Sequence, residues 1–320
     1  MCLSCLVRVM YGRLIMHYNH LAERYQPLQR KLQGKISFLE PMSRHTSLRV
    51  GGPAECFVEP CHLQDIQAIY TFAQAENLSV TVIGAGTNLL VSDRGIAGIV
   101  LQCKSGFTGY RLDEQLLTIQ SGWLLPDLIR LSHRHGLTGT GFLAGIPGSV
   151  GGAVYMNAGT SHHFFSDILH SGLLWDPVNL CLHQWNREDF QFGYRFSQIQ
   201  HQPMILLEAT LLLTKGDIQA EMVSIREQNT KRRQTQPLHF PNAGCTWKNP
   251  GKESAGYLIE ASGLKGRTIG KAMISSVHSN FIVNLGGATC QDILTLMEEV
   301  EKTVFERYNI QLVRELQMIV

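Results

Sequence analysis

Two glycine-rich segments limit the fold of this chain more than any other part of its sequence. The first, residues 84–88 (Gly-Ala-Gly-Thr-Asn), follows a short apolar run, and the second, residues 145–152, holds four glycines and a proline. Glycine lets backbone amides approach an anion closely, and Thr87 and Asn88 add side-chain donors. Two such segments in one chain favour a site for a cofactor with a long diphosphate.

Neither segment matches a common phosphate-binding motif. The third glycine of a dinucleotide fingerprint is missing, and residues 89–91 continue as an apolar strand instead of opening a helix. No glycine is followed by Lys-Ser or Lys-Thr, which excludes a P-loop. Alone, residues 84–88 are a weak signal, and an ordinary tight turn is the alternative for residues 145–152.

Composition places the chain among globular proteins. Its 320 residues give room for two domains, and 44% hydrophobic content allows a substantial core. A formal net charge of +2 predicts no nucleic-acid partner, and no apolar run approaches the ~20 residues of a membrane span. Eight scattered cysteines suit a reducing cytoplasm, and most are expected to be buried. Cys2 and Cys5 lack a second pair, so no metal site is expected.

Apolar spacing predicts an alternation of helices and strands. Helices are expected at residues 63–76, 127–135, 220–233, 254–262 and 290–308, the last with a Thr289/Asp292 capping pattern. Strands are expected at 47–50, 54–59, 79–83, 98–101 and 116–119, between 169 and 213, and at 310–320. The fold class is α+β, with a cofactor-binding region up to about residue 216 and a second unit beyond it.

Several residues with useful chemistry are individually equivocal. Cys245 lies beside Lys248, which would favour a thiolate if it is near, but a buried structural cysteine is the commoner case. Arg195 lies among aromatic residues, as a stacked structural side chain or as a substrate clamp. Glu315 and His278 suit a surface as well as a site.

Taken in order, the segments resemble one family, the bacterial UDP-N-acetylenolpyruvoylglucosamine reductases. The resemblance runs from about residue 40 to the end of the sequence, and its order is very specific. It rests on residues 45–54, 84–93, 145–153, 156–159, 192–197, 243–250, 255–260, 263–266 and 278–284. The chain looks like the shorter family type, because it lacks an insertion after Ser197 that carries an extra tyrosine loop.

The resemblance implies a fold and a reaction. The fold would be a two-part FAD-binding domain of the vanillyl-alcohol-oxidase type plus a smaller α+β substrate-binding domain. The expected divisions are an N-terminal extension without fixed structure (1–35), the FAD-binding domain (36–216), the substrate-binding domain (217–308) and a returning C-terminal strand (309–320). Non-covalent FAD, NADPH as reductant, a UDP-sugar substrate, a cytoplasmic location and a monomeric state are expected.

The resemblance also implies roles for individual residues. Arg195 would bind and polarise the substrate carboxylate, Glu315 would assist it, and Cys245 would donate the proton that follows hydride transfer from the flavin. The substrate-binding residues would be Tyr194, Lys248, Asn249 and His278. The cofactor-binding residues would be Arg49, Gly84, Ala85, Gly86, Thr87, Asn88, Leu89, Gly145, Ile146, Pro147, Gly148, Ser149, Gly151, Gly152 and Ala153.

Three positions depart from the family pattern. Many members have serine where this chain has Cys245, and a thiol is the better acid but is open to oxidation. Gln317 stands where an arginine is usual, and Thr235 lies near a usual lysine, which puts contacts to the diphosphate in doubt. The rival functions are another flavin oxidoreductase of the same superfamily and a flavin-binding protein without turnover.

Overall fold

The computed structural model describes residues 15–104, 106–251 and 253–320, so Cys2 and Cys5 lie outside the described residues. Residues 15–24 are helical and continue through Tyr25 into α2 (Gln26–Gln29). Leu21, Tyr25 and Leu28 are buried. The expectation of an extension without fixed structure is therefore wrong for residues 15–35. The helical segment packs into a hydrophobic core, the first core, that also contains Cys56, Ile66 and Leu101. The other expected domain boundaries stay predictions.

The first sheet pairs strands from residues 35 to 102 and has the order β1-β2-β5-β3. Its members are β1 (Lys35–Pro41), β2 (Pro53–Glu59), β5 (Ile96–Gln102) and β3 (Val80–Ile83). β2, β5 and β3 run parallel, and β1 is antiparallel to β2. Helix α3 (Leu63–Ala75) connects β2 to β3 and packs in the first core, as its apolar spacing predicts.

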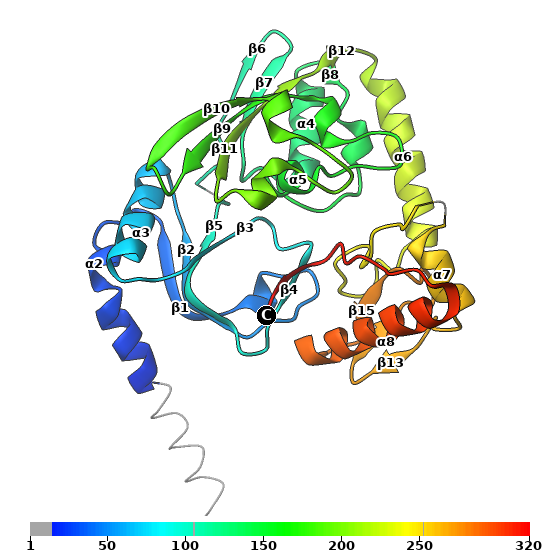
Figure 1. Ribbon diagram of the computed structural model, residues 1–320. Helices are drawn as coiled ribbons and strands as arrows, with labels where there is room; N and C mark the ends of the chain where they lie inside the picture. The colour runs from blue at the N-terminus through cyan, green and yellow to red at the C-terminus, as the bar shows by residue number, and fades with distance from the viewer. Residues whose placement is uncertain (1–14, 105, 252) are drawn as a thin grey trace, which may run out of the picture.

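The second sheet is antiparallel and has the order β10-β9-β11-β7-β6. Its members are β10 (Cys181–Asn186), β9 (Leu169–Asp176), β11 (Ile205–Leu212), β7 (Leu116–Gln120) and β6 (Tyr110–Asp113). Helices α4 (Leu125–Arg134) and α5 (Val150–Met156) share a hydrophobic core with this sheet (Figure 1). β8 (Leu137–Thr138) pairs with β12 (Thr214–Lys215) beside it. Short 3-10 turns lie at Met42–Arg44, Gly141–Leu143, Phe165–Asp167, Arg187–Phe190 and Gln198–His201.

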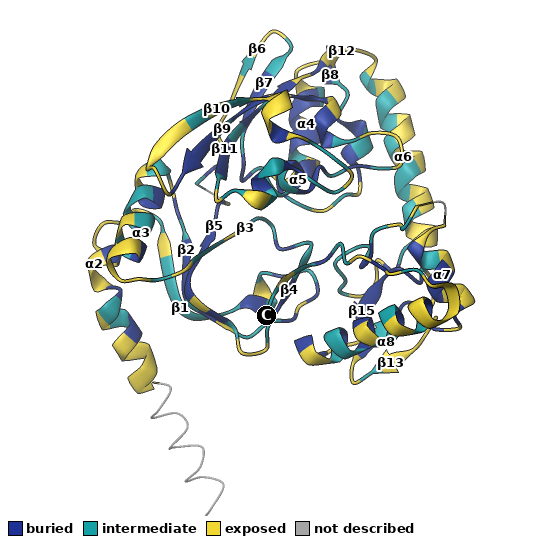
Figure 2. Cartoon of the chain, in the orientation of Figure 1, coloured by how far each residue is buried: buried dark blue, intermediate teal, exposed yellow. Residues whose placement is uncertain are grey.

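A third unit follows the long helix α6 (Ile218–Thr235). It contains α7 (Ala255–Ala261), β13 (Thr268–Ile269), β14 (Ala272–Ile274), β15 (Ile282–Asn284) and α8 (Cys290–Tyr308). Thr289 and Asp292 form the expected capping box at the start of α8. Helix α6 has no fully buried residue and spans the edge of the molecule between the second sheet and this unit (Figures 1 and 2).

The end of the chain returns to the first half of the molecule. β16 (Gln317–Ile319) runs parallel to β4 (Leu89–Val91), directly after the first glycine-rich loop (Figure 1). Arg314 forms an isolated bridge with Trp247. The expected strand over residues 310–320 is therefore reduced to three paired residues. Glu315 lies between these two attachments.

Two further expectations differ from the structure. Residues 47–50 form a turn instead of a strand, because the Thr46 hydroxyl donates to Val50 O and accepts from Val50 N, while Arg49 adopts φ +54°. Residues 150–152 open helix α5 instead of continuing the loop, because the Ser149 hydroxyl accepts from Gly152 N. Of the described helices, none is long and apolar enough to cross a bilayer.

Candidate active site

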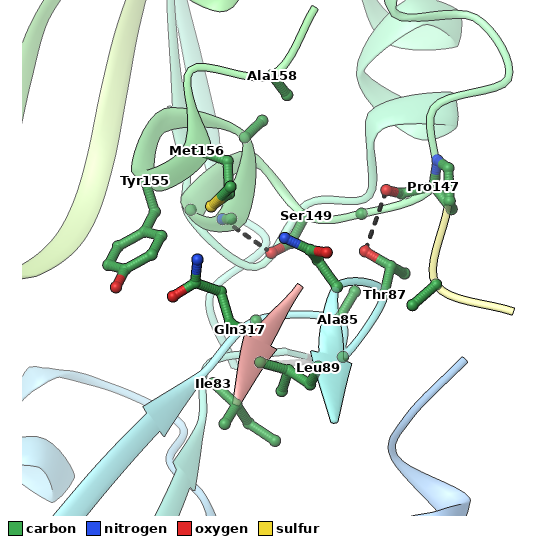
Figure 3. A pocket seen from close by; sticks show the side chains of 18 of the residues that line it. Ile83, Ala85, Thr87, Leu89, Pro147, Ser149, Tyr155, Met156, Ala158 and Gln317 are labelled. Atoms are coloured by element: carbon green, nitrogen blue, oxygen red, sulfur yellow. Dashed lines mark hydrogen bonds between the residues drawn. The ribbon is translucent and has the colours of Figure 1, made fainter. Parts of the chain in front are cut away.

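The two glycine-rich loops face one another across a cavity of about 1020 Å³. The Thr87 hydroxyl donates to Pro147 O at 3.1 Å and joins them directly (Figure 3). Gly84 lies against the second loop, because an added Cβ would lie 2.8 Å from the Ser149 hydroxyl. Gly86 has φ +69° and leaves no room for a side chain beside His45 O. Both close approaches require glycine.

The cavity wall contains every predicted residue of the two loops. These residues are Gly84, Ala85, Gly86, Thr87, Asn88, Leu89, Gly145, Ile146, Pro147, Gly148, Ser149, Gly151, Gly152 and Ala153. Arg49 is not part of this wall and lies in the turn after Thr46. The cavity volume is at the upper end of the range for cofactor and ligand sites, as an extended dinucleotide requires.

Unsatisfied polar atoms in the described wall fit a bound polar group. The Ser121 hydroxyl and Arg195 Nη1 are buried without a hydrogen-bond partner, and both residues line the cavity. Buried polar atoms are normally paired, so these two indicate a ligand with acceptors. Together with the glycine backbones of both loops, they fit a phosphate-bearing cofactor and an anionic substrate.

Arg195 and Glu315 form a half-buried ion pair at the cavity wall. Arg195 Nε donates to Glu315 Oε1 at 2.6 Å, and Nη2 donates to Gly159 O at 3.3 Å. The guanidinium lies 5.2 Å from the centre of the Tyr194 ring. Arg195 also has φ +54°, in a turn where Gly193 bridges Phe196. This turn aims the side chain at a partner 120 positions away in the sequence.

The protonation of Glu315 reflects two opposing effects. Burial raises the pKa of its carboxyl, while the positive charges of Arg195 and Lys248 lower it, and burial is the larger effect. Glu315 N donates to Thr246 O at 2.8 Å, so the backbone is held to the segment that carries Cys245. The carboxylate is thus fixed beside Arg195 and close to the cysteine segment.

Cys245 lines the same cavity and carries a protonated thiol. Its pKa is raised to about 12: burial and the charge of Glu315 raise it, and the charges of Arg195 and Arg232 lower it. Gly244, with φ +79°, precedes it, and Gly244 N donates to Asn242 Oδ1. Lys248 was expected to favour the Cys245 thiolate if it lay near. It is not among the charges that shift the pKa of the thiol, and it lowers the pKa of Glu315 instead.

Arg232 is a wall residue that the sequence did not reveal. It lies near the end of α6, where the run Lys-Arg-Arg suits a solvated helix terminus equally well. An added Cβ on Gly145 would lie 2.8 Å from Arg232 Cδ, so the arginine packs on the second loop. Burial lowers its pKa. Arg232 is thus part of the cavity wall beside the loop, and its charge acts on Cys245.

Other wall residues were also missed. They include Tyr155, Met156, Gln200 and Phe240. Gln317, which departs from the family pattern, also lines the cavity and projects beside Tyr155 and Ser149 in Figure 3. Gln317 Nε2 donates to Glu315 O at 3.4 Å. Nothing in their local sequence distinguishes them from core or surface residues, because their position depends on pairing across the fold.

The four residues expected to bind substrate lie outside the cavity wall. Tyr194 is 47% exposed and stacks on Arg195, while Lys248 N donates to Val313 O. Asn249 Oδ1 accepts from Ala255 N at the start of α7. His278 Nδ1 accepts from Asn280 N, and burial lowers its pKa. Their role in binding stays a prediction.

Comparison with known proteins identifies the family. Residues 54–178 match the family model described as FAD binding domain, and residues 236–319 match UDP-N-acetylenolpyruvoylglucosamine reductase, C-terminal domain. The reductase of Bacillus velezensis is 38% identical over 297 residues, which cover 92% of this chain and 97% of the relative. The chain belongs to the UDP-N-acetylenolpyruvoylglucosamine reductase family. The reductase of Bacillus subtilis gives the same identity and the same coverage.

A solved structure of this reductase family has the same fold. The UDP-N-acetylenolpyruvylglucosamine reductase from Thermus caldophilus is similar with a TM-score of 0.77 and 33% identity. The match covers 90% of this chain and 100% of that one. The expected α+β fold with an FAD-binding domain of the vanillyl-alcohol-oxidase type is confirmed, as are the oxidoreductase class and FAD as the cofactor.

Proposed function

We propose that this chain reduces UDP-N-acetyl-3-O-(1-carboxyvinyl)-glucosamine to UDP-N-acetylmuramate, using FAD and NADPH, in peptidoglycan precursor synthesis. One observation supports the proposal most strongly. Arg195, Cys245 and Glu315 line the same cavity as both glycine-rich loops. The names of the relatives and the match of both domain models support the same reaction. A reductase of another hydroxy acid or sugar would leave this set of three unexplained.

The substrate carboxylate is assigned to Arg195. Reduction of the enol ether places negative charge on the α-carbon and its carboxylate, which a fixed cation stabilises. Arg195 Nη1 is buried and has no partner in the described structure, so it is available as a donor. Glu315 holds Nε at 2.6 Å and so fixes the plane of the guanidinium.

The proton that completes the reaction is assigned to Cys245. Hydride addition at the vinyl terminus leaves the α-carbon to accept a proton, and the donor must carry that proton at neutral pH. Burial holds the Cys245 thiol in its protonated form. A high pKa makes the thiol a weak acid in the resting state, and the neighbouring Arg195 and Arg232 charges would stabilise the thiolate after transfer.

The loop residues and Ser121 are assigned to the cofactor, which we propose is bound without a covalent bond. When bound, FAD supplies two-electron transfer between NADPH and the substrate, chemistry that side chains lack. The backbone amides of both loops, with Thr87 and Ser149, would hold its diphosphate. The close approach of Gly84 to Ser149 sets the width of this cradle.

We further propose that the enzyme works in the cytoplasm as a monomer on a UDP-sugar. All six cysteines of the described chain are free, as is usual in a reducing compartment.

Stopped-flow measurement of the two half-reactions tests the assignment of Cys245. In Cys245→Ala we expect NADPH to reduce the flavin at a rate within about threefold of the wild type. Reoxidation by the enolpyruvyl substrate should slow by about 10²-fold or more, the usual contribution of general acid catalysis. Cys245→Ser should keep substantial reoxidation because a hydroxyl also donates a proton.

Cys61→Ala is the matched control, because Cys61 is an exposed free cysteine outside the cavity wall. Normal turnover in Cys245→Ala would remove the proton-donor role. A wild-type protein that is yellow yet does not reoxidise with the enolpyruvyl substrate would contradict the proposed reaction and favour a flavin-binding protein without turnover.

A further inference from the structure

A second cluster of reactive side chains lies on the hairpin of β9 and β10, apart from the active-site triad. Asp176 ends β9, and Cys181 and His183 belong to β10. The potential ligand atoms of all three residues lie within 4.8 Å of one another. Neither the family reaction nor the cavity wall uses these side chains.

Strand register places the three side chains on one face. Cys181 is directly opposite Asp176 in the antiparallel pair, and His183 follows two positions later on the same strand. Residues two apart project from the same face of a strand, and directly opposed residues are near neighbours. The regular hairpin therefore brings a carboxylate, a thiol and an imidazole together. None of these three residues needs a special backbone conformation.

Two of the three separations are close to those of a tetrahedral zinc site, and the third lies within 4.8 Å. Cys181 Sγ lies 3.2 Å from His183 Nε2, and His183 Nε2 lies 3.5 Å from Asp176 Oδ2. Ligands at the usual zinc distances of about 2.0–2.3 Å would be about 3.6 Å apart for sulfur and nitrogen, and about 3.4 Å for nitrogen and oxygen. Only small side-chain movements would bring all three atoms to one ion.

The carboxylate is already fixed before any ion binds. Asp176 Oδ1 accepts from Val178 N at 2.8 Å and from Asn179 N at 3.0 Å. Asp176 Oδ2 accepts from Asn179 Nδ2 at 2.7 Å and keeps lone-pair capacity on the side of His183. These bonds orient the carboxylate in the way that outer partners orient metal ligands.

We propose that Asp176, Cys181 and His183 form a binding site for Zn²⁺. A thiolate, an imidazole and a carboxylate together favour zinc over magnesium or calcium, which prefer oxygen ligands. Cys181 is exposed and His183 is partly exposed, so the ion can enter from solvent and keep water in its fourth position. Zinc here would clamp the turn between β9 and β10, where Pro177 borders the cofactor cavity.

Calorimetric titration with Zn²⁺ and zinc X-ray absorption spectroscopy test the proposal. Both use protein that has FAD bound and its cysteine thiols reduced. We expect one Zn²⁺ per chain and one sulfur scatterer at about 2.3 Å. Cys181→Ser should remove the sulfur scatterer, and both Cys181→Ser and His183→Ala should weaken binding at least tenfold. Asp176→Asn should also weaken binding while keeping an acceptor for the turn.

Cys61→Ser is the control and should bind Zn²⁺ as the wild type does, because Cys61 is exposed but lies outside the hairpin. Retained flavin absorbance and reductase turnover in each variant show that it is folded. Absence of stoichiometric binding would overturn the proposal. So would zinc without a sulfur ligand, or equal affinity in Cys181→Ser, His183→Ala and the wild type.

Discussion

At the scale of residues, the site is built from charges that act on one thiol. Glu315, Arg195 and Arg232 all shift the pKa of Cys245, although they come from a C-terminal segment, a turn and helix α6. Burial and the charge of Glu315 keep this half-buried thiol protonated, while the two cations would stabilise a transient thiolate.

Replacement of Arg232 should weaken catalysis. In Arg232→Gln we expect kcat/KM to fall at least tenfold, because a half-buried cation in the cavity wall is lost while the helix is kept. Arg233→Gln is the matched control, since Arg233 is the exposed neighbour on the same helix, and it should stay within twofold. Steady-state kinetics give kcat/KM for both variants. Equal kcat/KM in Arg232→Gln and Arg233→Gln would rule out a role for Arg232.

The raised pKa of Cys245 predicts a flat response to alkaline pH. With a pKa of about 12, only about one thiol in 10⁴ is ionised at pH 8. Between pH 7 and 9.5, loss of the Cys245 proton should therefore not reduce the rate of reoxidation, and Cys245→Ser should show the same profile. Iodoacetamide at pH 8 should label exposed Cys61 much faster than Cys245, as mass spectrometry can measure. Comparable labelling rates would contradict the raised pKa.

The sequence predicted the residues of the site unevenly. Local chemistry left Arg195, Cys245 and Glu315 ambiguous, and only the ordered resemblance to one family brought them together. Most cysteines were expected to be buried; of the six described, Cys56, Cys103 and Cys290 are buried, while the other three are half-buried or exposed. Such positions depend on contacts across the fold, which no local pattern contains.

At the scale of elements, periodicity and caps predicted much of the fold. The 290–308 helix has the bounds expected of it, and α3 and α4 lie within two residues of theirs. The order of the second sheet was not predictable, because β11 pairs with β7 and β9 across long stretches of chain. Helix α6 is polar on every side, so its sequence gives no sign that Arg232 faces a cavity.

The start of α8 ties the third unit to the first sheet region. Asp93 accepts from Cys290 N at 2.8 Å and from Gln291 N at 3.1 Å, two amides that have no partner within the helix. Asp93→Ala should lower the free energy of unfolding by about 1.5–3 kcal/mol, the range for hydrogen bonds to a charged group. Urea denaturation measures this, with exposed Asp113→Ala as the control. An unchanged midpoint in Asp93→Ala would show that the contact does not stabilise the fold.

At the scale of the whole molecule, the active site depends on the pairing of β16 with β4. Gln317 N donates to Asn88 O, and Asn88 Nδ2 donates to Glu315 O, so the first loop holds the backbone of the segment that carries Glu315. The hydrophobic core of the third unit also includes Leu48 and Leu90 from the first half of the chain. The first glycine-rich loop, the C-terminal segment and the third unit are therefore held together by direct contacts.

A proline in β16 should disrupt both sides of the site. Gln317→Pro removes the amide that bonds to Asn88 O, and we expect flavin to bind at least tenfold more weakly and reoxidation by substrate to slow. Gln317→Ala keeps the amide and separates the effect of the side chain from that of the ladder. Fluorescence titration with FAD and stopped-flow kinetics give the two readouts. Wild-type values in Gln317→Pro would show that the ladder is dispensable.

The return of β16 to β4 also orders events during protein synthesis. Domains fold from the N-terminal side as a chain emerges from the ribosome, so both glycine loops can form before residues 315–319 exist. Until those residues are translated, β4 lacks its partner and Arg195 lacks Glu315. A nascent chain is thus able to form most of the cavity wall early, while the partner of Arg195 arrives only with the C-terminal segment.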